Sequence, residues 1–387
     1  MAFYHKLGKV APKRHTQFRK PDGGLYYEEL FGTRGFSGPY SLLYHLRQPT
    51  GVTRLARLEG PPVQPWELGE RRHHHLRTKG IEPSGDPMTG RRPLLYNDDV
   101  VLSVSRPTDS SYTFFRNSEA DEIHFVHEGS GELHTIFGTL DFRPGDYLVI
   151  PRGTIWQMAL HDKSCRFLVI EGYGGGIETP ARYRNEFGQL LEQAPYSQRD
   201  IRLPEALDTH DEEGDFEVVT KLRDGLMSYQ YAGHPFDVAG WDGYVYPWAL
   251  NIADIDPITG RVHQPPPTHQ TFQGPNFVVC TFLPRKLDYH PLAIPSPYNH
   301  INVDYDEVLY YANNLYSSRT NVEMGSVTLH RRNLPHGPQP GAIEASIGKT
   351  ETKELAVMLD TLHPLRLTTY AQELDDPDYP YSWVKRK

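Results

Sequence analysis

Residues 129–153, GSGELHTIFGTLDFRPGDYLVIPRG, decide the fold. A strand, a turn and a second strand surround Gly129–Gly131, and Pro144-Gly145-Asp146 marks the next turn. The apolar run YLVIP follows and ends at Arg152-Gly153. Short strands broken by turns at this spacing favour a β-sandwich or barrel, and this order is typical of the small jelly-roll barrel called a cupin.

The same pattern extends outward on both sides of this stretch. Short apolar runs between turn residues fill residues 97–172, and a second strand-rich region covers residues 215–345. The sequence therefore predicts an all-β protein with few helices, built from two duplicated and diverged cupin barrels. The expected parts are a wrapping segment at 1–95, a metal-free barrel at 96–178, a helical linker at 179–214, a catalytic barrel at 215–345 and a tail at 346–387.

Two local interpretations complete this outline. Thr179-Pro180 has the N-cap and N1 residues that start a helix, so a helix is expected in the linker. Residues 61–95 are rich in Pro, Gly, Arg and His and are expected to form a loop that could order as a lid. Within this loop, residues 71–75 (RRHHH) are interpreted as a solvated surface run.

Composition excludes several classes of function. The formal net charge is −9 and the charges are mixed along the 387 residues, so a nucleic-acid partner is not expected. No apolar run is long enough to cross a membrane, and the N-terminus lacks the apolar stretch of a signal peptide. Cys165 and Cys280 are the only cysteines, which argues against a disulfide framework and for a cytoplasmic location.

The second strand-rich region carries a candidate metal site. His300, Glu307 and His336 follow one another in the order of a cupin metal motif, with Asn302 at the position of that motif's second histidine. Two imidazoles and one carboxylate on one face of a barrel form a facial triad, which leaves open coordination positions and suits non-haem Fe(II). Asp306 is a competing carboxylate. Neighbours in a strand point to opposite faces, and Glu307 is favoured because it directly precedes the apolar run VLYY.

The first half offers only part of such a motif. His124, His127 and Glu128 lie near the expected start of a metal motif, but Trp156 occupies the region where a later histidine would stand. We therefore expect the first barrel to be structural and to bind no metal.

Three segments resemble the homogentisate 1,2-dioxygenases, a family of bicupin enzymes with non-haem iron. They are residues 14–45, residues 296–311 (SPYNHINVDYDEVLYY) and residues 325–338 (GSVTLHRRNLPHGP). The resemblance implies an extradiol-type, Fe(II)-dependent dioxygenase that opens homogentisate to maleylacetoacetate with O₂, a step of tyrosine and phenylalanine catabolism. It also implies a homo-oligomer, because members of the family are hexamers built from trimers.

The resemblance assigns roles to residues one by one. His300, His336 and Glu307 match the iron ligands, with one extra residue between the first histidine and the carboxylate. Residues that match substrate-contacting groups are Tyr298, Tyr316, His330 and Arg319, the last replacing a lysine of better-known members.

The sequence departs from the family at Asp242. Family members have Trp-His-Gly where this chain has Trp241-Asp242-Gly243, and the resemblance gives that histidine a role on the ring hydroxyl. Asp242 or His330 would then handle the proton. Because a carboxylate is a weaker base than an imidazole, a dioxygenase for a related hydroquinone acid such as gentisate stays open as an alternative. Fold alone does not imply function, so a cupin that binds a metal or a small molecule without redox chemistry, and a cupin isomerase with Zn or Mn, stay open as well.

Overall fold

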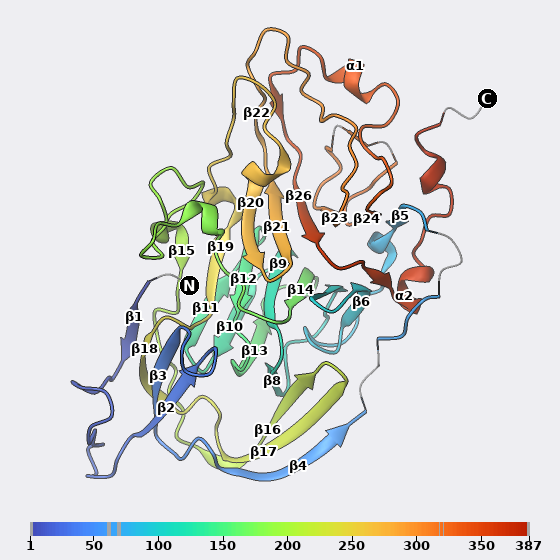
Figure 1. Cartoon of the computed structure of the whole chain (residues 1–387). Coiled ribbons are helices and arrows are strands. Elements are labelled where there is room, and N and C mark those ends of the chain that lie inside the picture. The colour runs from blue at the N-terminus through green and yellow to red at the C-terminus, as the bar shows by residue number, and fades with distance from the viewer. Residues whose placement is uncertain (1–2, 60–62, 68–70, 317, 320, 385–387) are drawn as a thin grey trace.

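The strand-forming patterns produce a chain that is mainly β-structure, as the computed structural model shows (Figure 1). The structure describes residues 3–59, 63–67, 71–316, 318–319 and 321–384. Helical structure in this part of the chain is short: α1 (Ala342–Ser346), α2 (Thr369–Gln372) and 3-10 turns at Thr78–Gly80, Ala181–Tyr183, Gln198–Asp200, Ile252–Asp254, Pro266–His269 and Tyr379–Tyr381. The expected all-β cupin class is confirmed. None of the described helices has the length and apolar character to span a bilayer.

Two large sheets form the first barrel. The seven-stranded sheet has the order β11 (Gly138–Phe142), β10 (Gly131–Thr135), β13 (Trp156–Leu160), β8 (Phe114–Asn117), β16 (Glu213–Leu222), β17 (Gly225–Gly233) and β4 (Val52–Leu58). The eight-stranded sheet has the order β15 (Ile201–Arg202), β19 (Trp248–Asn251), β12 (Asp146–Ile150), β9 (Asp121–Glu128), β14 (Arg166–Gly172), β7 (Val100–Ser105), β6 (Arg91–Tyr96) and β27 (Arg366–Leu367).

A third large sheet carries the residues of the candidate metal site. Its order is β20 (Gln270–Gly274), β21 (Phe277–Phe282), β26 (Ala356–Thr361), β23 (Asp306–Tyr311), β24 (Val327–His330) and β5 (His74–Leu76). A two-stranded ribbon of β22 (Arg285–Lys286) and β25 (Glu351–Thr352) lies above this sheet in Figure 1.

The eight-stranded sheet is buried on both faces. Along β9, Ile123 and Phe125 belong to an apolar core shared with Val308 and Leu359 of the six-stranded sheet. Val126, on the other face of β9, belongs to the core inside the first barrel. Because side chains alternate along each strand, the two faces of this sheet line two different cores. The two halves of the chain therefore pack together through the eight-stranded sheet.

The inside of the first barrel holds a buried ion network. Arg91 donates to both carboxylate oxygens of Glu122, at 2.7 and 3.0 Å, and to Glu171 at 3.1 Å. The Nε2 atom of His124 lies 2.9 Å from Glu122. Burial, against the pull of Glu122, lowers the pKa of His124. A guanidinium therefore provides the positive charge that these buried carboxylates require.

A four-stranded sheet brings the N-terminal segment onto the first barrel. Its order is β1 (His5–Gly8), β18 (Val238–Gly243), β3 (Tyr40–His45) and β2 (Tyr27–Gly32). Buried His45 joins these strands, because its Nδ1 lies 2.6 Å from Asp237 and its Nε2 lies 2.8 Å from Glu29. Burial lowers the pKa of His45, but the two carboxylates outweigh burial and raise that pKa to about 9.

Several sequence-based expectations about the middle of the chain differ from the structure. The helix expected after Thr179-Pro180 is wrong, since only a 3-10 turn at Ala181–Tyr183 forms there. Residues 213–251 were expected mostly in the second barrel, yet β16 pairs with β8 and β19 pairs with β12, so they complete the first barrel. The expected loop at 61–95 contains β5 and the start of β6; residues 61–62 and 68–70 of it, where a lid was considered, lie outside the described residues.

Candidate metal centre

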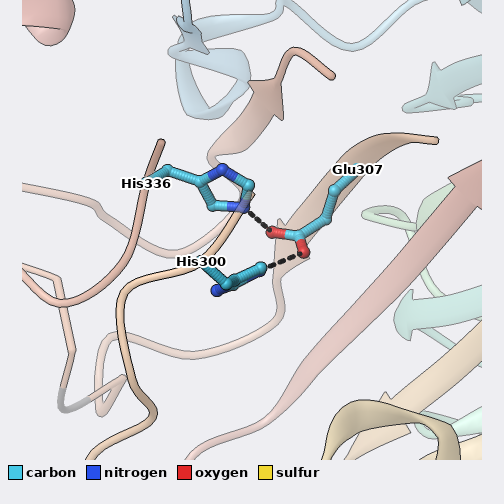
Figure 2. A group of neighbouring side chains, drawn as sticks. All are labelled: His300, Glu307 and His336. Carbon is cyan, nitrogen blue, oxygen red and sulfur yellow. Dashed lines mark ion pairs between the residues drawn. The ribbon is translucent and has the colours of Figure 1, made fainter. Parts of the chain in front are cut away.

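His300, Glu307 and His336 come together at the end of the six-stranded sheet. Glu307 is the second residue of β23. The two histidines lie in loops that pair as an isolated antiparallel bridge, in which His300 N donates to His336 O at 2.8 Å and His336 N donates to His300 O at 3.0 Å. This backbone bridge fixes both imidazoles opposite the carboxylate (Figure 2).

The donor atoms of this group fit a metal ion. One ligand atom from each residue can be chosen so that all lie within 4.8 Å of one another. His300 Nδ1 lies 3.3 Å from the carbonyl of Tyr298, and His336 Nδ1 lies 3.2 Å from the carbonyl of Leu334. These carbonyls accept the Nδ1–H, so each Nε2 keeps a free lone pair. His336 Nε2 is buried and has no hydrogen-bond partner among the described residues, as expected of a metal-binding nitrogen.

Glu307 and Asp306 point to opposite faces of β23. The Glu307 carboxylate lies 3.5 Å from His300 Nε2 and 3.4 Å from His336 Nε2. Asp306 instead accepts from Arg331 at 3.2 Å and from the backbone of Arg332 at 2.9 Å. The structure therefore gives Glu307 to the metal group, while Asp306 anchors the loop after β24.

Electrostatics keep the Glu307 carboxylate charged. Burial alone would raise its pKa, but the surrounding imidazoles of His300, His330 and His336 outweigh burial and hold the pKa well below its usual range. The same carboxylate raises the pKa of His300. Asp360, opposite Glu307 on β26, responds in the other direction: burial and then the charge of Glu307 raise its pKa well above the usual range.

His330 lies behind the metal group, not in the cavity. It is fully buried, its Nδ1 donates to Glu307 at 2.8 Å, and its Nε2 accepts from the Tyr379 hydroxyl at 2.9 Å. Its ring stacks on His336 with 4.5 Å between the centroids. Burial holds the pKa of His330 well below its ordinary value, so the ring is neutral. The sequence interpretation placed this residue on the substrate, whereas the structure makes it a support for Glu307.

A cavity of about 360 Å³ opens in front of His300 and Glu307. Tyr316 and Arg319, two of the residues expected to contact a substrate, line it. Tyr298, another of these expected residues, does not line it; its side chain is largely exposed and packs against His263, a cavity-lining residue, with 4.8 Å between the ring centroids.

Arg319 supplies a positive charge to this cavity. One of its terminal nitrogens donates to the carbonyl of Gly337, the residue after His336, and its guanidinium carbon lies 5.4 Å from the Trp383 ring centroid. Its Nε is buried and has no hydrogen-bond partner among the described residues. That N–H is therefore available to an anionic ligand.

The structure does not bring Asp242 to this centre. Asp242 lies on β18 in the four-stranded sheet and accepts a hydrogen bond from the Tyr4 hydroxyl at 2.9 Å. Figure 1 shows that sheet on the opposite side of the molecule from β23 and β24. Within one chain, Asp242 cannot act on a ligand in the cavity, which corrects the role expected for it.

Sequence reasoning missed the residues that pack behind the metal group. The run at 71–75 is wrong as a solvated loop, because its three histidines are buried and two of them belong to β5. His73 accepts from the backbone of Arg331, contacts the Pro335 carbonyl, and packs against both His330 and His336. The charged residues at 71–75 suggested an exposed run, so the buried role of these histidines was not predicted. A strand of three residues is also too short for its alternation of side chains to be recognised in the sequence.

The chain is similar to several known proteins. Residues 101–252 match the family model described as the homogentisate 1,2-dioxygenase N-terminal domain, and this match ends one residue after β19. The chain is 44% identical to a protein of Saccharolobus solfataricus that carries the provisional name of a dioxygenase, over 99% of both chains. It is 24% identical to a homogentisate 1,2-dioxygenase of Rhodopseudomonas palustris, over 98% of this chain and 89% of that one. Among solved structures, a cupin barrel protein of Leptotrichia buccalis matches with a TM-score of 0.36 and 11% identity, over 78% of this chain and 100% of that one.

Proposed function

Because the chain belongs to the homogentisate 1,2-dioxygenase family, we propose that it is an Fe(II)-dependent dioxygenase that cleaves the ring of a hydroquinone acid, with homogentisate as the first candidate substrate. The observation that carries this proposal is the group formed by His300, Glu307 and His336 at the wall of a cavity that also contains Arg319. The product from homogentisate would be maleylacetoacetate, which places the enzyme in tyrosine and phenylalanine catabolism.

The donor set suits iron(II). Two neutral imidazole nitrogens and one carboxylate oxygen form the ligand set of non-haem Fe(II) oxygenases, which leaves open coordination positions. His300, Glu307 and His336 would hold the ion, which when bound would supply the acidification of a phenolic hydroxyl and the reactivity toward O₂. Both oxygen atoms of O₂ enter the product, so the reaction needs no external reductant.

Arg319 would orient the substrate. Its guanidinium is held at the wall of the cavity by Gly337, and its Nε–H lacks a described partner. A carboxylate can bind two N–H groups of a guanidinium at once, which fixes its direction as well as its position. Orientation of the ring relative to the metal contributes to catalysis because the reacting atoms must meet in one geometry.

Proton transfer from the ring hydroxyls would fall to the cavity histidines. His263 and His269 both line the cavity, and neither belongs to the metal group. His263 Nε2 is buried without a hydrogen-bond partner among the described residues. An imidazole that can accept and donate a proton suits this role better than Asp242, which lies in another sheet.

Exposed apolar side chains beside the cavity support a homo-oligomer. In the segment before and after His300, Tyr289 is 71% exposed, Leu292 is 84% exposed and Val303 is 70% exposed. Clustered exposed apolar residues mark interaction surfaces. We propose that a second copy of the chain covers them, in line with the assembly that the family resemblance implies.

Oxygen uptake by the purified protein, loaded with Fe(II) without air, tests the proposed reaction. Homogentisate and gentisate are supplied in parallel, and the absorbance of the ring-opened product is followed. Uptake with homogentisate supports the proposal as stated. Uptake with gentisate alone would favour the second candidate, which Arg319 in place of a family lysine also favours. No uptake with either, in a sample that holds stoichiometric iron, would refute a dioxygenase for these acids and leave a metal-binding cupin without redox chemistry.

A further inference from the structure

The C-terminal segment contacts the metal centre from behind. Trp383 donates its indole N–H to the carbonyl of Gly337 at 2.9 Å, one residue after His336. Its ring also packs against His73 and His330, with centroid distances of 5.7 and 6.4 Å. Figure 1 shows this end of the chain running beside β24 and β5. The turn that contains Trp383 is therefore part of the wall around the candidate site.

The same tryptophan holds the cavity arginine. The Arg319 guanidinium lies 5.4 Å from the Trp383 ring centroid, within the range of a cation–π contact. Arg319 and Trp383 also donate to one acceptor, the Gly337 carbonyl. No carboxylate forms an ion pair with Arg319 among residues 3–59, 63–67, 71–316, 318–319 and 321–384. The Ser318 carbonyl also accepts from Arg319 at 3.3 Å, and the hydroxyls of Tyr311 and Tyr379 hydrogen-bond to the guanidinium. All of these direct partners are neutral, which leaves the charge of Arg319 available to a ligand.

We propose that Trp383 is a positioning residue that directs Arg319 toward the anionic end of the substrate. The inference rests on the proposed function for the identity of that substrate. A flexible arginine side chain loses much rotational freedom when it is fixed, and a preformed contact removes that cost from the binding step. Trp383 would therefore set the preference of the cavity for acids over neutral aromatic compounds.

A purely structural role for Trp383 makes different predictions. If the ring only packed against His73 and His330, its loss would disturb the metal group and weaken all ligands equally. If it positions Arg319, its loss would weaken acidic ligands alone and would have no effect once Arg319 is absent. A double-mutant cycle separates the two roles, because only coupled residues give non-additive changes.

The experiment uses Trp383→Leu, Arg319→Gln, the double variant, and Val384→Ala as a matched control at the exposed neighbouring position. Calorimetric titration of the anaerobic Fe(II)-loaded proteins compares phenylacetate with 2-phenylethanol, a neutral compound of similar size. We expect Trp383→Leu to weaken phenylacetate by about fivefold, the size of one partly buried cation–π contact. Binding of 2-phenylethanol, iron content and the Val384→Ala control should stay unchanged. In the Arg319→Gln background, Trp383→Leu should add nothing.

Three results would overturn the proposal. They are equal weakening of both compounds, loss of iron from Trp383→Leu, and additive effects in the double variant. Failure of wild-type protein to bind phenylacetate in preference to 2-phenylethanol would overturn it as well. Failure of the proposed reaction is distinguishable, because it would abolish O₂ uptake by wild-type protein while leaving the selective binding of phenylacetate and its loss in Trp383→Leu. For an active enzyme, the matching signature is a raised KM for the acid substrate with kcat preserved.

Discussion

Replacement of His330 by phenylalanine tests whether this residue supports the metal or acts on the substrate. Phenylalanine keeps a ring that can pack on His336 but removes both nitrogens. The lost Nδ1–H bond joins a buried donor to the charged carboxylate of Glu307 at 2.8 Å. A hydrogen bond to a charged group contributes about 1.5–3 kcal/mol. At 1.4 kcal/mol for each tenfold change, the affinity for Fe(II) should fall by about 10- to 150-fold.

Tyr379→Phe provides a graded companion to His330→Phe. It removes only the hydroxyl that donates to His330 Nε2 at 2.9 Å and leaves Glu307 with its direct donor. A bond between neutral groups contributes about 0.5–1.5 kcal/mol, so iron affinity should fall by only about 2- to 12-fold. Anaerobic competition with a chelator measures both affinities, and urea unfolding of the metal-free proteins checks that the fold survives. Unchanged iron affinity in His330→Phe, together with a large loss of kcat, would refute the support role and restore His330 as a substrate-contacting residue.

Four further predictions follow from the described geometry. Glu307→Ala should abolish stoichiometric iron binding while Asp306→Asn retains it, as metal analysis would show; the opposite pair of results would reassign the ligand. His45, whose folded pKa is about 9, should stabilise the fold fully below its unfolded value near 6.5 and lose that contribution of about 3 kcal/mol as the pH rises through 9; a difference in unfolding free energy between wild type and His45→Gln that did not change with pH would contradict this. Asp242→Asn should leave kcat unchanged, and a steep loss of kcat would show that a neighbouring chain brings this residue to the cavity. Leu292→Asp should dissociate the proposed oligomer in sedimentation experiments, and an unchanged sedimentation coefficient would place the interface elsewhere.

Most of the fold could be predicted from strand and turn patterns, because these patterns depend on residues that are close together in the sequence. Gly145, for instance, has a φ of +89° in the turn that the Pro144-Gly145-Asp146 run predicts, and β12 begins directly after that turn. The choice of Glu307 over Asp306 needed only the alternation of side chains along one strand and the apolar run VLYY that directly follows Glu307. Such patterns are readable because each residue's role depends on its immediate neighbours.

The parts that sequence reasoning missed depend on contacts between distant segments. His73 and Trp383 reach the metal group from opposite ends of the chain, and neither belongs to a recognisable motif. The helix predicted after Thr179 does not form, because capping residues alone cannot stabilise a helix that has no apolar face to pack against the core. The family motif alone suggested that Asp242 lies at the substrate. In the structure, β18 pairs with β1, so Asp242 lies in the four-stranded sheet.

The pairing of β5 with β24 and of β27 with β6 has a consequence for how the protein is made. β5 comes early in the chain but closes the edge of the late six-stranded sheet, and β27 comes near the end but closes the edge of the early eight-stranded sheet. Ribosomal synthesis delivers the N-terminal strands first. The edge of β6 then stays open until the residues of β27 have emerged, and pairing at such sequence separation is slow. A nascent chain of this protein therefore passes through a stage with an uncovered strand edge, the stage at which a chaperone would matter most for its yield.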